Sequence, residues 1–507
     1  MTKPSSTTFS ARFAARLFSG MAGALVIFLG VTTAAPASAA TVEWSTPANL
    51  SVSGGSAGDS RIVVDGSDNA VAVWLRFDSD SNRIAQSSWS DDGGASWSAP
   101  VNLSEPGEWA SDVGVVLDGS GIAHAVWGRY DGNDGRVQYT RSVDGGVSWS
   151  VPVNLSTSGG SAERPKISVD GSGNLVAVWN RSDGNNDIIQ SSRSTNSGVS
   201  WSTPVDLSLT GQDASNSQVA SDGSGNLVAV WNRSDGSNQI VQASRSINGG
   251  ASWSTPANLS ESGVDSERQR VAIDGSGNAV VVWLRDPFGD SIVQTSRFVA
   301  GGASWSTPVN VSTAGNSAAT PQFAIDGSGN AVAVWRYFGV DGTIIQSSHS
   351  TDGGASWSTP VQLSVYPGSS DDPQVAADGA GNVFAIWRQS KGSNRIIRSS
   401  QSTDGGASWT VPTDLSEDGS SADKPMVAVD GSGNAIALWN RSNGDNDIIQ
   451  ASRSSAINGG GGGGEELANT GPGGSVNDAM LVASTGLLAL GVLTRSIIRR
   501  RRVLNLR

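Results

Sequence analysis

Short runs of apolar residues recur along the chain at a nearly constant interval. Each run follows a variant of Asp-Gly-Ser-Gly-Asn and ends in Trp, as in the segment Leu-Val-Ala-Val-Trp at residues 175–179. The first Asp of the segment recurs at spacings of 53 once and 52 thereafter, at Asp65, Asp118, Asp170, Asp222, Asp274, Asp326, Asp378 and Asp430. A fixed period of this length indicates an array of similar structural units.

The unit at residues 166–208 illustrates the elements that the pattern predicts. Four short segments, 166–170, 174–180, 188–194 and 201–207, are separated by clusters of Gly, Asn, Asp and Ser that favour turns. None of them has a sustained helical period. Four strands in a unit of about 52 residues are typical of a β-propeller blade.

A second series of tryptophans indicates how the ring closes. Seven members lie inside the repeats, at Trp97, Trp149, Trp201, Trp253, Trp305, Trp357 and Trp409. Trp44 is the eighth, because residues 44–51 match residues 253–260 one for one. We therefore predict an all-β fold: an eight-bladed β-propeller of four-stranded antiparallel blades over residues 41–455. Its N-terminal strand would complete the last blade and remove a free sheet edge.

The N-terminal segment has the order of a secretory signal peptide. Residues 1–40 contain basic residues, then an apolar run at 21–31, then small residues ending at Ala39 and Ala40. The run is much shorter than the roughly 20 residues that a membrane-spanning helix needs. We expect cleavage after Ala39 or Ala40.

The C-terminal segment resembles the cell-wall sorting signals of Gram-positive bacteria. A Gly-rich linker at 456–466 leads to residues 467–507, which contain a short motif, an apolar stretch at 479–494 and a basic cluster at 499–502. The motif consists of Leu467, Ala468, Asn469, Thr470 and Gly471, with Ala where the commonest form has Pro. The resemblance implies that a sortase cuts after Thr470 and joins it to the wall.

In that scheme the apolar stretch holds the chain in the membrane only transiently, with the basic cluster on the cytoplasmic side. The alternative is an ordinary C-terminal anchor helix. Both interpretations predict a secreted protein attached to the cell wall or cell surface.

Composition and charge exclude several classes of function. The formal net charge is −13, and only Lys166, Lys391 and Lys424 are lysines between residues 41 and 471, so nucleic-acid binding is disfavoured. There is no Cys and there are two His, which leaves no basis for a thiolate or multi-histidine metal centre. We expect a monomer without a cofactor. The Asp-Gly-Ser-Gly-Asn segment offers oxygen ligands for calcium but lacks the later Glu of an EF-hand loop, which favours a hairpin turn.

The turn after the third strand carries a family resemblance. Residues 402–409, Ser-Thr-Asp-Gly-Gly-Ala-Ser-Trp, fit the Asp-box pattern Ser-x-Asp-x-Gly-x-x-Trp and resemble the BNR repeats of sialidase-like propellers. The capping position is occupied by Asp92, Asp144, Asn196, Asn248, Asp352 and Asp404, and by Ala300 in another copy. We interpret this residue as a structural cap of turn amides, because an Asp or Asn oxygen accepts such bonds and Gly adopts positive φ.

Catalysis is not indicated by the same residues. The resemblance to sialidases implies an Arg triad, a Tyr nucleophile paired with Glu and an Asp acid, but none of the tyrosines Tyr130, Tyr139, Tyr337 and Tyr366 can be matched to the family motif by its context. Catalysis needs a few unlike residues held together, whereas this chain repeats the same residues around a ring. A sialidase-like exo-glycosidase, with two carboxylates among the many acidic residues, remains the alternative.

Candidate ligand-binding residues lie in the turns after the inner Trp and in the links between blades. One group consists of aromatic residues that could stack on sugars or contact proteins: Trp109, Tyr130, Tyr337, Phe338 and Tyr366. The other consists of arginines one or two residues after the inner Trp: Arg76, Arg129, Arg181, Arg233, Arg285, Arg336, Arg388 and Arg441. The arginines could bind an anionic glycan or form structural salt bridges. We predict a non-catalytic, adhesin-like binding propeller for an extracellular carbohydrate or protein.

Overall fold

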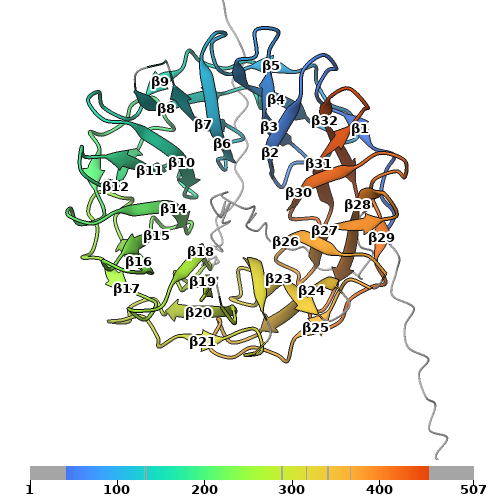
Figure 1. The fold of residues 1–507 in the computed structure, drawn as a ribbon. Helices are drawn as coiled ribbons and strands as arrows, with labels where there is room; N and C mark the ends of the chain where they lie inside the picture. Colours follow the sequence, from blue (N-terminus) through green and yellow to red (C-terminus); the bar gives the residue numbers. More distant parts are fainter. Residues whose placement is uncertain are drawn as a thin grey trace, which may run out of the picture. The chain divides into compact units, whose positions relative to one another are not determined.

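The computed structural model describes residues 42–130, 132, 134–286, 289–315, 317–339, 342–365 and 367–455. The predicted signal peptide, Gly-rich linker and sorting signal lie outside these residues, as does Tyr366. Within them the chain forms eight four-stranded antiparallel sheets arranged around a central channel, which confirms the predicted eight-bladed propeller (Figure 1).

The first strand of each blade lies beside the channel and the second lies behind it (Figure 1). The first strands are β2 (Ala57–Val64), β6 (Trp109–Leu117), β10 (Ala162–Val169), β14 (Ala214–Ser221), β18 (Ser266–Ile273), β22 (Ala318–Ile325), β26 (Ser370–Ala377) and β30 (Ala422–Val429). The second strands are β3 (Ala70–Phe77), β7 (Ala123–Tyr130), β11 (Leu175–Ser182), β15 (Leu227–Ser234), β19 (Ala279–Arg285), β23 (Ala331–Gly339), β27 (Val383–Lys391) and β31 (Ala435–Ser442).

The third and fourth strands complete each blade toward the rim. The third strands are β4 (Arg83–Ser90), β8 (Gly135–Ser142), β12 (Asp187–Ser194), β16 (Gln239–Ser246), β20 (Ile292–Phe298), β24 (Gly342–Ser350), β28 (Asn394–Ser402) and β32 (Asp447–Arg453). The fourth strands are β5 (Val101–Asn102), β9 (Val153–Asn154), β13 (Val205–Asp206), β17 (Ala257–Asn258), β21 (Val309–Asn310), β25 (Val361–Gln362), β29 (Thr413–Asp414) and, for the eighth blade, β1 (Ala48–Asn49).

The second strands form the core because both of their faces are covered by neighbouring blades. Their apolar runs do not alternate with polar residues, as expected for strands buried on both sides. The closing Trp of each run is fully buried, and the indole N–H of Trp74 donates to Gln86 Oε1 of the next strand at 3.2 Å. Large buried rings at the same position in every blade fix the spacing between adjacent sheets.

The N-terminal strand closes the ring as predicted. β1 pairs with β32 through Ala48 with Ala451 and Asn49 with Gln450, and Trp44 forms a further bridge to Ser454. Figure 1 shows β1 beside β32, although the two strands lie at opposite ends of the sequence. The Trp44 ring also packs edge-on against Phe384 of the seventh blade, with ring centroids 6.0 Å apart.

Two strand boundaries differ from the sequence prediction. The first strand of the unit at 166–208 begins at Ala162 rather than Lys166, because a bulge containing Arg164 and Pro165 continues the strand past its apolar part. The fourth strand has only Val205–Asp206 in the ladder, since Pro204 has no N–H to contribute.

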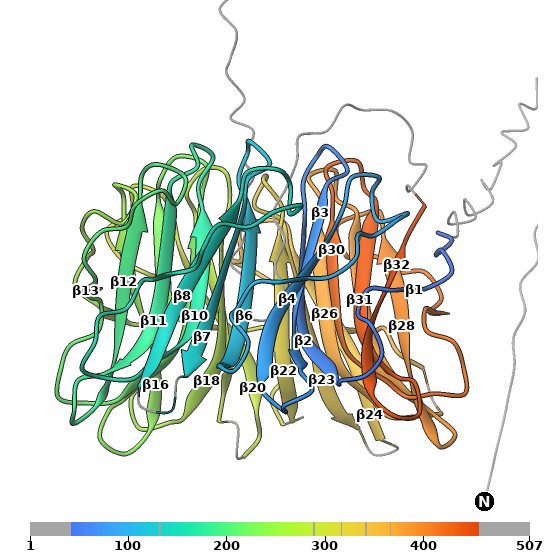
Figure 2. The ribbon, with the colours of Figure 1, turned by 90° about the horizontal axis from the view of Figure 1, so that it is seen from above.

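The blades give the propeller two different faces, seen edge-on in Figure 2. The Asp-Gly-Ser-Gly turns and the Asp-boxes share one face, where the Gly93 amide donates to the carbonyl oxygen of Asp68 at 2.8 Å. The other face, called the link face below, carries the links that enter each blade and the turns between second and third strands. No helix in the described part of the chain is long and apolar enough to span a bilayer.

Candidate functional site

Each first strand contains a β-bulge near the link face, and a residue in the bulge has positive φ. The ladder register shifts there, for example between Ser215 and Gln218 of β14. These residues, called the bulge ring, are Asp59, Asp112, Arg164, Asn216, Arg268, Thr320, Asp372 and Lys424, with φ between 47° and 59°. Positive φ at non-glycine positions is costly and often occurs where a binding site is built.

The first residue to pair again after each bulge forms a second ring around the channel. This post-bulge ring consists of Arg61, Gly114, Lys166, Gln218, Arg270, Gln322, Gln374 and Met426. Its three cations come from the first, third and fifth blades. Gly114 lies between Arg61 and Lys166 and leaves that position without a side chain. The blades therefore differ in sequence where they face the channel, although their cores are nearly the same.

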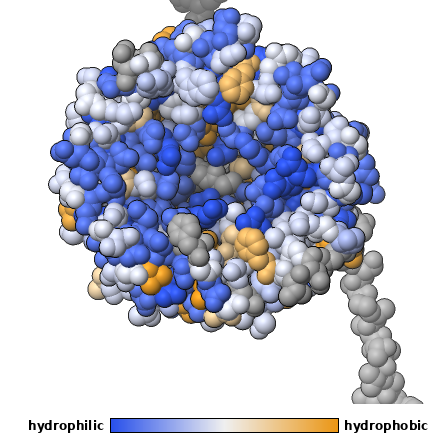
Figure 3. Space-filling model, viewed as in Figure 1, coloured by the Kyte–Doolittle hydropathy of each residue, from blue (hydrophilic) through white to orange (hydrophobic). Residues whose placement is uncertain are grey.

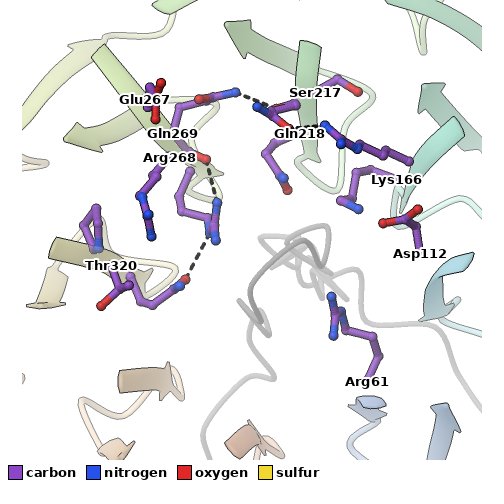
Figure 4. Close-up of a pocket in the computed structure, with 14 residues that line it drawn as sticks. Arg61, Asp112, Lys166, Ser217, Gln218, Glu267, Arg268, Gln269 and Thr320 are labelled. Carbon is purple, nitrogen blue, oxygen red and sulfur yellow. Dashed lines mark hydrogen bonds between the residues drawn. The ribbon is translucent and has the colours of Figure 1, made fainter. Parts of the chain in front are cut away.

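The two rings line a cavity of about 420 Å³ on one side of the channel. Five cationic and two acidic residues contribute to its wall. Figure 4 shows Arg61, Lys166 and Thr320, from three different blades, around this space. An adjoining cavity of about 300 Å³, which shares Arg61, Thr320 and Gln322 with the first, contains Asp59 and Asp372 together with Lys424. The channel thus has a cationic half and a half of mixed charge.

The cations of the first half affect one another. Burial and the positive charge of Arg61, followed by those of Arg270 and Arg164, lower the pKa of Lys166 to about 8, although Asp112 opposes the shift. Burial and the same Arg61 charge lower the pKa of Arg270 to about 10. Like charges that converge in a desolvated space disfavour the protonated form of each group.

Six of the eight candidate arginines share one place on the second strand, opposite the start of the first strand. Arg76 and Arg233, for example, lie opposite Ala57 and Ala214. In four blades the guanidinium contacts the link that enters its own blade: Arg129 with Glu108, Arg181 with the Thr157 carbonyl oxygen, Arg285 with Glu261 and Arg441 with Glu417. These contacts hold the links against the blades.

Arg336 and Arg388 do not join that set. They lie one residue earlier in their strands, and a shift of one residue turns a side chain to the other side of the sheet. Both pair with Asp371, at 2.7 and 2.8 Å, and Arg388 also pairs with Asp423 at 2.9 Å. The eight arginines therefore form two structural groups rather than one uniform ring. Their role in ligand binding stays a prediction.

The aromatic candidates fall into separate places on the link face. The exposed fractions of Phe77, Trp109 and Tyr130 are 37%, 42% and 48%. Phe77 and Trp109 meet edge-to-face at 5.9 Å, and Trp109 lies opposite Tyr130 in the sheet register. We call these three residues the aromatic patch. It joins the first and second blades at their link-face ends.

The remaining described candidates lie in the sixth blade. Tyr337 takes the strand position that an arginine has in six other blades and packs against the core. Phe338 is exposed, and the guanidinium of Arg336 lies over its ring at 4.5 Å. Figure 3 shows a largely hydrophilic face on which hydrophobic side chains form small separate areas.

The Asp-boxes form hydrogen-bonded turns. Ser90 Oγ donates to Asp92 Oδ1 at 2.8 Å and accepts from the Gly94 amide, while the Ser96 amide donates to Asp92 Oδ1 at 2.9 Å. Asn196 accepts the equivalent amide bond, from Ser200, at 3.0 Å. The capping position therefore works with either an acid or an amide side chain.

The Asp-Gly-Ser-Gly-Asn segments likewise form turns that use the Asp oxygens internally. Asp65 Oδ1 accepts the amides of Ser67 and Asn69, both at 2.9 Å, and its Oδ2 accepts from the Asn69 side chain at 2.7 Å. Among the described residues, no group of three or more His, Cys, Asp or Glu side chains is placed to hold a metal ion.

Comparison with known proteins gives only distant structural similarities. No protein-family profile and no curated protein matches the chain. A polysaccharide lyase, an ulvan lyase, aligns with 10% identity and a TM-score of 0.42 over 66% of this chain and 88% of its own. The intramolecular trans-sialidase of Ruminococcus gnavus aligns with 13% identity and a TM-score of 0.39 over 69% and 96%. The leech intramolecular trans-sialidase aligns with 12% identity and a TM-score of 0.38 over 76% of this chain and 83% of its own. These similarities assign no role to any residue of this chain.

Proposed function

We propose that this chain is a non-catalytic binding propeller, secreted and attached to the cell wall through its C-terminal motif, that binds an extracellular carbohydrate on the link face. The observation that carries the proposal is the aromatic patch. Trp109 and Tyr130 are partly exposed, and exposed aromatic rings are suited to packing on the apolar face of a sugar ring. Around the patch the blades are hydrogen-bonded and regular, which would hold the rings in fixed positions.

The core of the blades supports a binding role over a catalytic one. The Asp-box and Asp-Gly-Ser-Gly carboxylates, which recur most often, are engaged in capping their own turns. Arg129 and Glu108, beside the patch, are paired with each other. Arg83, whose guanidinium lies over the Phe77 ring at 6.0 Å from its centroid, is paired with Asp59. The charged groups nearest the aromatic rings therefore have structural partners.

The test is binding of the full chain to a glycan array, with Trp109→Ala as the variant. We expect at least a tenfold loss of affinity for the retained glycans, because the central ring of the patch is removed. Val411→Ala, which removes an exposed apolar side chain outside the patch, should bind as the unchanged protein does. Equal binding by the Trp109 variant would rule out the patch as the site.

The hydrolase alternative is tested with the same protein. Incubation with a panel of fluorogenic glycosides, including sialosides, should release no fluorophore above the uncatalysed rate. Turnover that a single carboxylate substitution on the link face abolishes would replace the binding proposal with an exo-glycosidase. The attachment to the cell wall is tested with Thr470→Ala, which should release the chain from the wall fraction.

A further inference from the structure

We propose that the cationic half of the channel is a second binding site, which takes a carboxylate or sulfate group of an acidic saccharide. The anion site rests on the cavity alone. That its ligand is a saccharide rests in part on the proposed function. The site is distinct from the aromatic patch, because Asp112 of the cavity lies three residues beyond Trp109 along β6, a distance of roughly 10 Å at about 3.3 Å per strand residue.

The first argument is the absence of carboxylate partners. Among the described residues, no Asp or Glu lies within salt-bridge distance of Arg61, Lys166 or Arg270. Their bonds are to neutral groups: Arg61 to the Ser60 carbonyl oxygen at 2.7 Å, Lys166 to that of Pro165 at 3.2 Å, and Arg270 to Gln322 Oε1 at 3.0 Å.

The other half of the channel provides the contrast. There Lys424 pairs with Asp59 at 2.7 Å, and Asp372 lies 3.3 Å from Arg388. The charged bulge residues of that half are therefore ion-paired, whereas Arg61, Lys166 and Arg270 in the first half have no carboxylate at salt-bridge distance. Asp112 acts on Arg61 and Lys166 only at longer range. In a protein with a formal net charge of −13, this concentration of positive charge is local and selective.

The second argument concerns the polar atoms between the cations. Within the described part of the chain, four residues that line the cavity each have a buried polar atom without a hydrogen-bond partner: Arg61 Nε, Ser217 Oγ, Gln269 Oε1 and Thr320 Oγ1. One is a donor, one an acceptor, and two are hydroxyls that can do either. A ligand with both an oxyanion and several hydroxyl groups can form hydrogen bonds with all four atoms. An inorganic anion only accepts hydrogen bonds and leaves the amide oxygen of Gln269 without a donor.

The third argument is size. A space of about 420 Å³ lies in the range of small-molecule sites, roughly 300 to 1,000 Å³, and suits one or two sugar rings. The ligand's negative charge would also relieve the mutual repulsion of Arg61, Lys166 and Arg270. Binding is therefore expected to weaken with increasing salt.

The experiment is calorimetric titration of the full chain with three probes: trigalacturonate, a sulfated maltotriose and unmodified maltotriose. We expect at least one acidic probe to bind and maltotriose to bind at least tenfold more weakly. Lys166→Gln should reduce the acidic affinity at least tenfold, while Lys166→Arg should retain most of it. Lys391→Gln, which removes an exposed lysine outside the cavity, is the matched control and should have no effect.

The outcomes separate this inference from the proposed function. No binding of either acidic probe at millimolar concentration, or equal binding by Lys166→Gln, overturns the anion site even if Trp109-dependent glycan binding is found. Inorganic sulfate that competes as well as the sulfated trisaccharide does would overturn the saccharide assignment. If binding of the acidic probes depends on Lys166 and no glycan binding depends on Trp109, the anion site is supported and the aromatic patch is ruled out as a binding site.

Discussion

The Asp-box shows how single residues stabilise the propeller without chemistry. Hydrogen bonds from the Ser96 side chain and amide, together with one from Ser90, lower the pKa of Asp92 to about 2 despite the opposing effect of burial. The carboxylate is thus stabilised in its ionised form. Its Asn counterparts make the same cap without any charge, as Asn196 and Asn248 do in two blades.

This difference predicts a pH dependence that distinguishes charge from geometry. Asp92→Asn should be nearly neutral at pH 7, whereas Asp92→Ala should cost about 1 kcal/mol, the usual value for a lost cap. Because the folded pKa lies below the unfolded one, the contribution of the Asp is present above about pH 4 and is lost as the pH falls toward 2. The Asn variant should lack that loss. Thermal unfolding at pH 6 and pH 3 measures both effects, and identical Asn and Ala curves would contradict the capping role.

At the scale of the strand, the bulge is the feature that builds the channel wall. The positive φ in each first strand aims residues into the channel, and the residue types there tolerate that conformation unequally. Asn adopts it with little strain, whereas β-branched Thr is a real outlier. Thr320, with φ of 47°, is the β-branched member of the bulge ring.

A reciprocal exchange between two blades tests this strain. Thr320→Asn should raise the free energy of unfolding by about 1 kcal/mol, at the low end of the cost of such backbone strain. Asn216→Thr, at the matching position of β14, should lower it, and by more, because it also removes the 2.9 Å bond from Arg164 to Asn216 Oδ1. Denaturant unfolding of both variants measures the shifts. A destabilised Thr320→Asn would show that the bulge is not strained by its side chain.

The strands that could be predicted from the sequence are those in which buried apolar residues recur in a regular pattern. The second strands are apolar throughout, and the Trp, Gly and Asp positions repeat at fixed spacing, so blade number and ring closure followed from the sequence. The bulges could not be predicted, because Glu163, Arg164 and Pro165 are polar or strand-breaking and look like a loop. The cavity was missed for the same reason, since Arg61, Lys166 and Arg270 meet only once eight blades are placed around one axis.

The arginine candidates also show that spacing in the sequence does not fully predict where a side chain lies. Arg336 and Arg388 are one residue out of step with the rest, which in sequence is a minor irregularity. In a strand it places them on the other side of the sheet, where they contact Asp371 instead of a link. The spacing from the recurring Trp therefore predicts roughly where an arginine lies along its strand. It predicts the side of the sheet only when the number of residues between the Trp and the arginine is the same in each blade.

At the scale of the whole propeller, closure depends on the pairing of β1 with β32, which lie at opposite ends of the described chain. The bond from Gln450 to Asn49 spans 401 residues, whereas the equivalent bond from Gln242 to Asn258 in the fourth blade spans 16. By the loop-length scaling of chain entropy, (3/2)RT ln n, closing the larger loop costs about 3 kcal/mol more in an otherwise open chain. The eighth blade should therefore open more easily at its outer edge than the others.

The identical local sequences at 44–51 and 253–260 make this testable with a matched pair of variants. Trp44→Ala should markedly reduce the hydrogen-exchange protection of the Leu50 amide, which donates to the Ile449 carbonyl oxygen at 2.8 Å. Trp253→Ala should reduce the protection of the Leu259 amide, which makes the same bond to Val241, far less, because β17 stays tethered by a short loop. Both variants lose a partly buried ring of the same type, so packing alone predicts equal effects. Equal loss of protection at the two sites would mean that the ring stays closed through contacts between the blades and that the N-terminal strand adds no more than any other fourth strand.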